Sequence, residues 1–265
     1  MALSAAQLKA REGMITASFL PVLMSGDKSK ILNRWQEIVG DPEFIAEDLS
    51  SIWAVEFGSF IEPFALDWHQ KKTGLPLIRR GEVVIHPTKP YFCCTLDAYR
   101  EPDRCVLDCK APGTWRKIEE VISYYTPQMI GQAACLKTSK AALLVVHGGS
   151  EPQEHPIEWT PEYEAQVWQC VEEFQHCCET LTPPVQMEPI APPVPPIKEY
   201  DFSSSNEFCN EAAIWLENRE ASKKFDGAAK NIKSLIPPDG IRAFGGGVTV
   251  NRSKSGSLTI KEAKS

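Results

Sequence analysis

The chain has 265 residues, of which 43% are hydrophobic and 24% are charged. This length predicts one large domain or one domain plus a small module, and the apolar content excludes a wholly disordered chain. The net charge of −7, taken alone, argues against a nucleic-acid partner. That charge is local, however: residues 1–150 are neutral, residues 151–198 carry −8 and residues 199–265 carry +1.

Neither a membrane span nor an export signal is expected. The longest apolar run, 141–146, is far shorter than the roughly 20 residues that a spanning helix needs. The N-terminal residues lack the basic-then-apolar order of a signal peptide, so we expect a cytoplasmic protein. Nine cysteines, an odd number without a Cys-x2-Cys pair, favour reduced thiols over disulfides or a zinc site.

A proline-rich stretch divides the chain. Seven of the fourteen residues from 183 to 196 are proline. Such a stretch favours polyproline II and cannot belong to a helix or a central strand. We therefore predict a main domain over 1–182, a linker over 183–196 and a C-terminal module over 197–265.

Hydrophobic periodicity predicts the elements in chain order. In the main domain we expect helices over 4–10, 27–40, 51–73, 115–138 and 162–180. Strands are expected over 81–86, 91–99, 104–110 and 141–147, with Glu101-Pro-Asp103 as a hairpin turn between the second and third. This order predicts an α/β fold with a central mixed sheet flanked by helices. The C-terminal module should add a helix over 206–235 and a hairpin of strands 248–250 and 258–260.

The predicted hairpin in the main domain carries two carboxylates and one ammonium group. Asp108 and Lys110 point to the same face of their strand, and the hairpin can bring Asp97 beside Asp108. Carboxylates that close repel each other unless a cation lies between them, and oxygen ligands favour Mg²⁺ or Mn²⁺. The lysine could then orient water or stabilise phosphorane charge. The spacing alone equally fits a solvated surface pair.

Two helical segments carry further polar residues that could join such a site. Glu62 follows Gly58 by one turn, and a glycine there would let the helix approach the sheet closely. Gln128 and Gln132 share a helix face, where one of them could orient a water molecule. Taken singly, each of these residues also fits an exposed position on a helix.

A short polar segment near the start of the chain could bind phosphate. Arg11, Thr16 and Ser18 lie in Arg-Glu-Gly-Met-Ile-Thr-Ala-Ser. Guanidinium and hydroxyl groups bind phosphate oxygens by forked and single hydrogen bonds. Ser18 could equally be a helix N-cap, and Arg11 a surface residue.

Four motifs follow one another in an order that resembles the YqaJ-like viral recombinase family. They are Arg-x-Gly-x-Ile-Thr-Ala-Ser, Gly-x3-Glu-Pro-x-Ala, Thr-Leu-Asp-x10-Asp-x-Lys and Tyr-x2-Gln-x3-Gln. This family includes lambda exonuclease and belongs to the PD-(D/E)XK nuclease superfamily. The resemblance covers about residues 8–150, with weaker support to about 182.

The resemblance implies a restriction-endonuclease-like core and a metal-dependent 5′→3′ exonuclease. Such an enzyme hydrolyses one strand of linear double-stranded DNA and leaves 3′ single-stranded tails for phage-type recombination. The implied partners are duplex DNA with 5′-phosphorylated ends and a single-strand annealing protein, and the implied location is the bacterial host cytoplasm. Some family members form trimeric rings around DNA, so a homotrimer is implied as well.

The resemblance also implies roles for individual residues. The metal, Mg²⁺ or Mn²⁺, would be held by Asp97, Asp108, the Cys109 carbonyl and Glu62. Catalysis would further need Lys110 and Gln128. A terminal 5′-phosphate would be held by Arg11, Ser18 and Thr95, with Thr16 as a neighbour.

Two positions depart from the family pattern. Asp108 stands where the family often has glutamate, and its shorter side chain would shift the metal slightly. Ala98 follows Asp97 where glycine is usual, which leaves the turn geometry open. Two other functions also stay open, an endonuclease of the same superfamily and a catalytically idle DNA-binding module. In the C-terminal module, Arg252 and Lys254 could contact single-stranded DNA, or the module could pack against the main domain.

Overall fold

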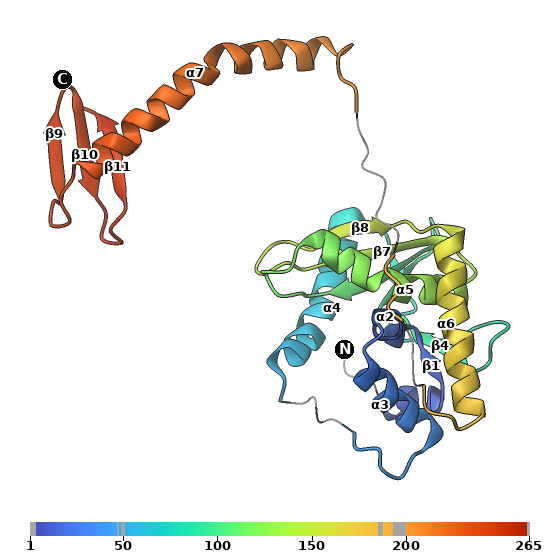
Figure 1. Ribbon diagram of the computed structural model, residues 1–265. Helices are drawn as coiled ribbons and strands as arrows, with labels where there is room; N and C mark the ends of the chain where they lie inside the picture. Colours follow the sequence, from blue (N-terminus) through green and yellow to red (C-terminus); the bar gives the residue numbers. More distant parts are fainter. Residues whose placement is uncertain (1–3, 47, 49–50, 185–187, 193–199, 264–265) are drawn as a thin grey trace. The chain divides into compact units, whose positions relative to one another are not determined.

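The computed structural model describes residues 4–46, 48, 51–184, 188–192 and 200–263. The chain forms two compact units, Met1–Pro195 and Pro196–Ser265 (Figure 1). Among the helices of the described ranges, none has the length and apolar character needed to cross a bilayer. Residues 185–187 and 193–196 of the expected linker lie outside the described residues. Ile190, between them, packs on the core of the first unit and donates its N–H to the Met24 carbonyl at 2.9 Å.

A five-stranded mixed sheet is the centre of the first unit, which confirms the predicted fold class. Strand β6 (Cys105–Lys110) pairs in parallel with β7 (Lys140–Val145) and antiparallel with β5 (Ala98–Arg100). The edges are β2 (Leu77–Ile78) and β8 (Gln153–Ile157). The sequence pattern did not predict these two strands. One is only two residues long, and the other contains Pro156, which only an edge strand tolerates.

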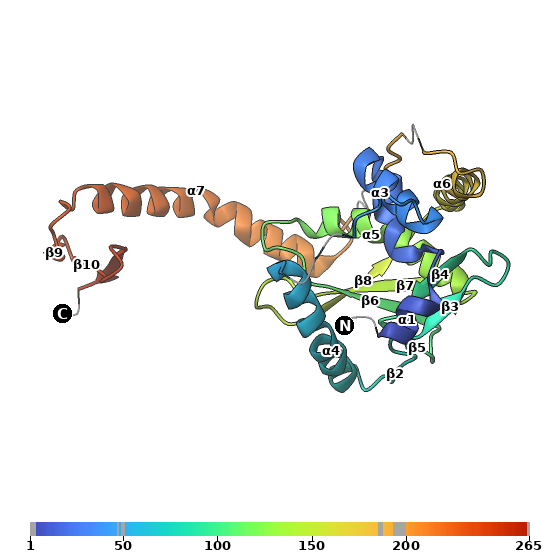
Figure 2. The same cartoon turned by 90° about the horizontal axis from the view of Figure 1, so that it is seen from below.

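Helices cover both faces of this sheet (Figure 2). On one face, α4 (Trp53–Thr73) packs Leu66 against Leu107 and Leu144. On the other face, α5 (Ile118–Cys135) packs Met129 against a larger core. That core also receives η1 (Ala17–Phe19), α2 (Leu20–Ser25), α3 (Lys28–Val39) and α6 (Pro161–Glu179). Because side chains alternate along β6, Asp108 faces α5 whereas its neighbours Leu107 and Cys109 face α4.

The predicted strand over 91–99 is wrong, because the chain changes sheets within it. Its first part, β4 (Phe92–Thr95), lies between β1 (Ile15–Thr16) and β3 (Val83–Ile85) in a second, three-stranded sheet. Its last part is β5 of the central sheet. Leu96 still bonds to the loop before β3, through Gly81 and Glu82, and Asp97 lies at the crossing. Apolar residues alternate from Phe92 to Ala98 without interruption, so the pattern gave no signal of the break.

The predicted helices exist with small shifts at their ends. The first is α1 (Ala5–Ala10), which begins at a capping box formed by Ser4 and Gln7. The segment 115–138 forms the single helix α5. Neither η1 nor α2 was predicted, because each is too short to show a helical period.

The second unit consists of α7 (Asn206–Ser234) followed by a three-stranded antiparallel sheet. Its strands are β9 (Arg242–Gly245), β10 (Val248–Arg252) and β11 (Leu258–Glu262), with β10 in the middle. The expected hairpin therefore gains a strand, since the Gly246-Gly247 turn, with both φ angles positive, joins β9 to β10. Val250 is the one buried side chain among the described residues of this unit.

Arg252 has a structural role that the sequence did not predict. Its guanidinium donates to the carbonyl oxygens of Gly240 at 2.9 Å, Pro237 at 3.0 Å and Gly256 at 3.3 Å. These bonds tie the end of the helical segment and the β10–β11 turn to the sheet. Three of its five N–H groups are thus occupied, whereas Lys254, the other residue considered for a DNA contact, has an exposed side chain.

Candidate active site

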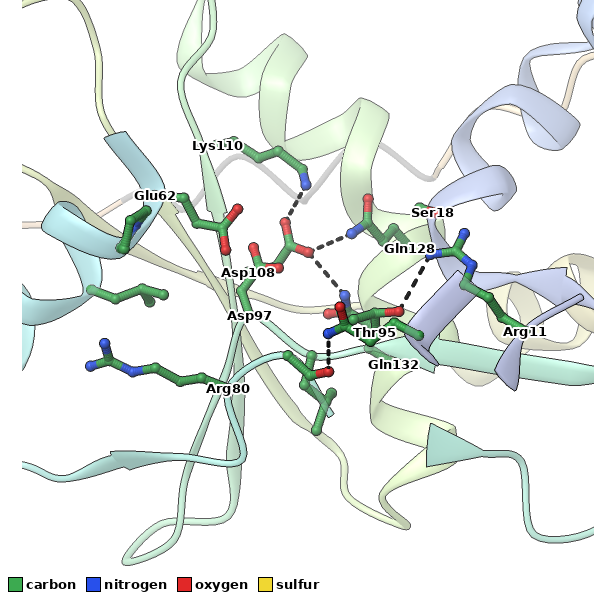
Figure 3. Close-up of a pocket in the computed structure, with 15 residues that line it drawn as sticks. Arg11, Ser18, Glu62, Arg80, Thr95, Asp97, Asp108, Lys110, Gln128 and Gln132 are labelled. Carbon is green, nitrogen blue, oxygen red and sulfur yellow. Dashed lines mark hydrogen bonds and ion pairs between the residues drawn. The ribbon is translucent and has the colours of Figure 1, made fainter. Parts of the chain in front are cut away.

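One cavity in the first unit gathers side chains that lie far apart in the sequence (Figure 3). It has a volume of about 230 Å³. Eight residues that the sequence analysis assigned to catalysis, metal or phosphate line it, namely Arg11, Ser18, Glu62, Thr95, Asp97, Asp108, Lys110 and Gln128. Cys109 lines an adjoining cavity instead, and Thr16 lies buried behind Ser18.

Asp108 is held by three donors from two elements. Its side chain is 1% exposed. Oδ1 accepts hydrogen bonds from Gln128 Nε2 at 2.5 Å and Gln132 Nε2 at 2.9 Å, both from one face of α5. Oδ2 lies 2.5 Å from Lys110 Nζ, which follows on the same face of β6. A buried carboxylate costs several kcal/mol unless it is paired, and these donors offset that cost.

Asp97 sits where the chain passes from β4 to β5. Pairing of β5 with β6 ends at Ala98 and Leu107, so the Cys109 N–H donates instead to Asp97 Oδ2 at 2.8 Å. Burial and the nearby Asp108 and Glu62 carboxylates raise the pKa of Asp97 well above its ordinary value, and Lys110 opposes them only in part. A cation at this position would therefore favour the ionised carboxylate.

Lys110 is placed over an aromatic ring and beside both aspartates. Its Nζ lies 4.8 Å from the centroid of the Tyr125 ring. Burial lowers the pKa of Lys110, but attraction to Asp108 and Asp97 outweighs it and raises the pKa above its ordinary value. The ammonium is therefore charged at neutral pH and can act only as a donor.

Glu62 reaches the cavity from α4 and points toward the two aspartates (Figure 3). Pro63 follows it inside the helix, where it removes one helical hydrogen bond, and it also lines the cavity. The close approach predicted at Gly58 is wrong, because a Cβ there would meet no atom within 4 Å. Among the glycines inside the described helices α4, α5 and α7, the one in close contact is Gly131 of α5, where a Cβ would lie 2.8 Å from Leu20 Cδ1 and 2.9 Å from Phe92 Cζ.

The opposite wall of the cavity carries the phosphate-binding candidates. Arg11 follows α1 and donates from Nη1 to Thr95 Oγ1 at 3.3 Å, at the end of β4. Ser18 lies within η1 rather than at its N-cap, and its hydroxyl is 3.1 Å from that of Thr16. Burial lowers the pKa of Arg11, and Arg34 adds to this, although a guanidinium stays charged in proteins. A bound anion would stabilise this half-buried charge.

The carboxylate side of the cavity fits a hard divalent cation. Half-buried Asp97 and buried Asp108 bring two carboxylates together, and Asp108 Oδ2 has the Lys110 ion pair but no hydrogen bond. The available donors are oxygens, which Mg²⁺ and Mn²⁺ prefer. Within the described part of the chain, no three His, Cys, Asp or Glu side chains form a ready-made ligand cluster. The Cys109 carbonyl and Glu62 would have to complete the ligand set.

Two residues of the cavity were missed by the sequence analysis. Gln7 donates from Nε2 to the Gly81 carbonyl at 2.5 Å and so closes one side. Arg80 lines the cavity and bonds to Asp67 and Gln70 of α4. Neither belongs to a motif. The only signal was a pair of arginines, Arg79 and Arg80, just before a glycine.

A second cavity adjoins the first and shares Glu62 and Lys110 with it. Trp115 and Arg116, in the loop before α5, line its outer part. The Trp115 side chain is exposed, and the Arg116 guanidinium lies 5.7 Å from its ring and 5.5 Å from that of Tyr124. The lysine and the glutamate thus lie between two open spaces.

Known proteins resemble this chain in sequence family and in fold. A family model described as YqaJ-like viral recombinase domain matches residues 7–141. The crystal structure of LHK-Exo, an alkaline exonuclease from Laribacter hongkongensis, is similar with a TM-score of 0.57 and 22% identity, over 68% of this chain and 94% of that chain. LHK-Exo in complex with dAMP is similar with a TM-score of 0.56 and 21% identity, over the same shares. No curated protein matches the chain.

These matches bear on fold and family in different ways. The solved structures show that the first unit has a restriction-endonuclease-like exonuclease fold. The family match, over residues 7–141, covers just over half of the chain and contains all four motifs. Family membership in turn supports a nuclease of the phage exonuclease type. The chain therefore belongs to the family of YqaJ-like viral recombinase domains.

Proposed function

We propose that this chain is a metal-dependent 5′→3′ exonuclease of linear double-stranded DNA, which leaves 3′ single-stranded tails for phage-type recombination. One observation carries the proposal: a single cavity has a guanidinium and two hydroxyls on one wall and paired carboxylates with a lysine on the other. The first wall suits a terminal phosphate, and the second suits hydrolysis of the next one. The exonuclease fold of LHK-Exo supports the same reaction class.

In this proposal Arg11, Ser18 and Thr95 bind the terminal 5′-phosphate. The guanidinium offers forked donors, and the two hydroxyls add single ones. A 5′-hydroxyl end would leave the half-buried Arg11 without an anion, so it would bind less well. The preference for a 5′-phosphorylated end thus comes from the Arg11 charge, which lies inside the cavity rather than on an open surface.

Hydrolysis takes place at the phosphate that joins the first nucleotide to the second. A divalent cation held by Asp97, Asp108, the Cys109 carbonyl and Glu62 would supply Lewis-acid stabilisation of charge when bound. The oxygen of water bonds to phosphorus, the bond from phosphorus to the 3′ oxygen breaks, and that oxygen receives a proton. The products are a 5′-mononucleotide and a strand with a new 5′-phosphate, which is again a substrate for the same wall.

The remaining side chains position these groups. Lys110 donates to the attacking water or to a phosphate oxygen. Gln128 and Gln132 fix the orientation of Asp108 through its Oδ1. Trp115 and Arg116, in the adjoining cavity, would hold nucleotides that follow the reacting one, by stacking and by charge.

We further propose the partners that this activity requires. The substrate is duplex DNA with a 5′-phosphorylated end, and a single-strand annealing protein takes up the 3′ tails in the bacterial host cytoplasm. A homotrimeric ring around the duplex would keep an acidic chain on a polyanion by topology, with fewer phosphate contacts.

An end-labelled assay tests the proposal. The substrates are linear duplexes with a 5′-phosphate or a 5′-hydroxyl and a closed circle, each with Mg²⁺ or Mn²⁺. We expect rapid loss of the 5′-phosphorylated strand, abolished by Asp108→Asn but not by Asp226→Asn, an exposed aspartate of α7. Cleavage of the circle would indicate an endonuclease. Binding of DNA without hydrolysis in either metal would indicate an idle binding module.

A further inference from the structure

Helix α7 has no core of its own to pack against. It spans 29 residues, and none of its side chains is buried within the described residues. Ile214 is 54% exposed and Phe225 is 75% exposed. The sheet that follows α7 buries only Val250 among its described side chains. A long helix with an unpaired apolar stripe generally has a partner.

Five apolar side chains of α7 follow a heptad, whereas Phe208 and Trp215 lie along its flank and Leu216 lies on the far side of the helix. Ile214, Ala221 and Ala228 are spaced by seven residues, and Phe225 and Ile232 are likewise spaced by seven. The two series alternate by three and four residues and so form one continuous stripe. We call these five residues the α7 stripe. Asn218 occupies the heptad position between Ile214 and Ala221, where the stripe is interrupted by a polar residue.

The charges of α7 are separated along its length. Residues 206–220 hold four glutamates and one arginine, a net charge of −3. Residues 221–234 hold four lysines and one aspartate, a net charge of +3. Two such helices side by side in parallel would place like charges together. Antiparallel helices would place each acidic half beside a basic half, and charge complementarity of this kind selects the orientation.

The α7 stripe also fits an antiparallel arrangement in its packing. With a two-fold axis near residue 223, Ile214 of one helix faces Ile232 of the other. In the same register Ala221 faces Phe225, and Asn218 faces Ala228. A large side chain then always meets a small one near the axis, which allows the helices to interdigitate.

We propose that α7 pairs antiparallel with α7 of a second copy of this chain. The stripe supplies the apolar contact, and the separated charges set the direction. This interaction is independent of the nuclease cavity and goes beyond the proposed exonuclease. It would join two catalytic units, or two rings of them, through their C-terminal modules.

Crosslinking of the full-length chain tests the pairing. Ser222 lies next to the stripe and near the two-fold axis, so a cysteine there would meet its copy only in an antiparallel pair. Lys223 points to the opposite side of the helix and provides the control position. Both cysteines are introduced in a Cys209→Ser background, which removes the exposed native thiol of α7. A short bis-maleimide then links thiols that lie close together.

We expect a covalent dimer from Ser222→Cys and none from Lys223→Cys. Adding Phe225→Glu should abolish the dimer, whereas Leu216→Glu, on the far side of α7 with a 62% exposed side chain, should leave it intact. The readout does not depend on whether the main domains form a ring. No dimer from Ser222→Cys, or equal yields at 222 and 223, would overturn the proposal. Those results would favour packing of α7 on its own main domain or contact with another partner.

Discussion

At the scale of single residues, the site depends on how one carboxylate is oriented. Two amides, one helical turn apart on α5, donate to the same oxygen of Asp108, and Lys110 faces the other oxygen. The carboxylate is therefore fixed in direction as well as in place. If Asp108 binds a metal as proposed, the two amides would be expected to affect metal affinity or activity by about 10- to 100-fold.

Gln132→Leu tests this orientation. The leucine fills a similar volume and removes one of the two amide donors, so we expect nuclease activity to fall by about 10- to 100-fold. Stability should fall by about 1.5–3 kcal/mol, because the buried Asp108 carboxylate loses one donor, so activity is compared where both proteins are fully folded. Gln175→Leu, which breaks only a surface bond to Glu179, is the matched control. Full activity of Gln132→Leu would show that Gln128 orients Asp108 alone.

Arg11→Gln tests the terminal-phosphate wall. The change keeps donors but removes the charge, so the ratio of cleavage rates on 5′-phosphorylated and 5′-hydroxylated ends should fall toward one. Rates on the 5′-hydroxyl substrate should change little. Arg79→Gln alters an arginine paired with exposed Glu82 and should keep the preference. If the ratio is unchanged in Arg11→Gln, the terminal phosphate does not bind at Arg11 and the proposed phosphate site is wrong.

At the scale of elements, the position of α5 determines where the two amides lie. Gly131 lies between them in sequence and lets α5 rest directly on Leu20 and Phe92. Side chains at this contact are fully buried and closely packed. A small displacement of α5 would therefore be transmitted to Gln128 and Gln132 together.

Gly131→Ala should push α5 outward. Overpacking of this kind costs about 1–3 kcal/mol, against a gain in helix propensity of about 1 kcal/mol. We expect a lower denaturation midpoint in urea together with lower activity. Gly227→Ala in α7, where a Cβ meets nothing within 4 Å, should be neutral or stabilising. An unchanged midpoint in Gly131→Ala would mean that the side chains of Leu20 and Phe92 can move aside without loss of stability.

Arg100 of β5 forms ion pairs that include Glu154 of the edge strand β8, and these pairs should make stability depend on pH. It is 7% exposed and bonds to Asp103 and to Glu154 of β8. Hydrogen bonds to Arg100 lower the pKa of both carboxyls below their ordinary values of 3.8 and 4.5. Depressed carboxyl pKa values stabilise the fold above those ordinary values, and this contribution is lost as the pH falls through the lowered ones.

Arg100→Met should therefore destabilise the protein at pH 7 by about 3 kcal/mol, because Glu154 is left partly buried and unpaired by arginine. It should also lose less stability than the parent between pH 5 and about pH 3. Urea denaturation at several pH values measures both effects. Lys223→Met breaks an exposed pair with Glu220 and should show neither. Equal acid sensitivity of parent and Arg100→Met would contradict this account.

At the scale of the whole molecule, the two units differ in how much they bury. The first unit has one core on each side of its sheet, whereas the described residues of the second unit bury one side chain. We expect amide hydrogen exchange to be slow in α5 at any protein concentration. In α7 it should become faster on dilution, because pairing with a second copy protects it. Concentration-independent exchange in α7 would argue against that pairing.

The sequence predicted which residues gather in the cavity better than it predicted the path of the chain. Alternation along a strand and the order of the four motifs placed Asp97, Asp108 and Lys110 together, and all three line one cavity. Gln7 and Arg80 were not predicted, since they reach the cavity only through tertiary packing. The change of sheet at Asp97 was hidden by continuous alternation from Phe92 to Ala98. Close packing of a glycine was placed at Gly58 instead of Gly131, because spacing does not reveal which face of a helix meets a neighbour.

The peptide unit at Cys109 has a consequence for how this protein can be studied. Its N–H holds Asp97, while the thiol packs under α4. Alanine scanning replaces only the side chain and would report this position as a packing residue. Replacing the amide by an ester would remove the donor and keep the thiol. Natural variation at residue 109 should accordingly be wide among small apolar side chains, although its main-chain N–H holds Asp97.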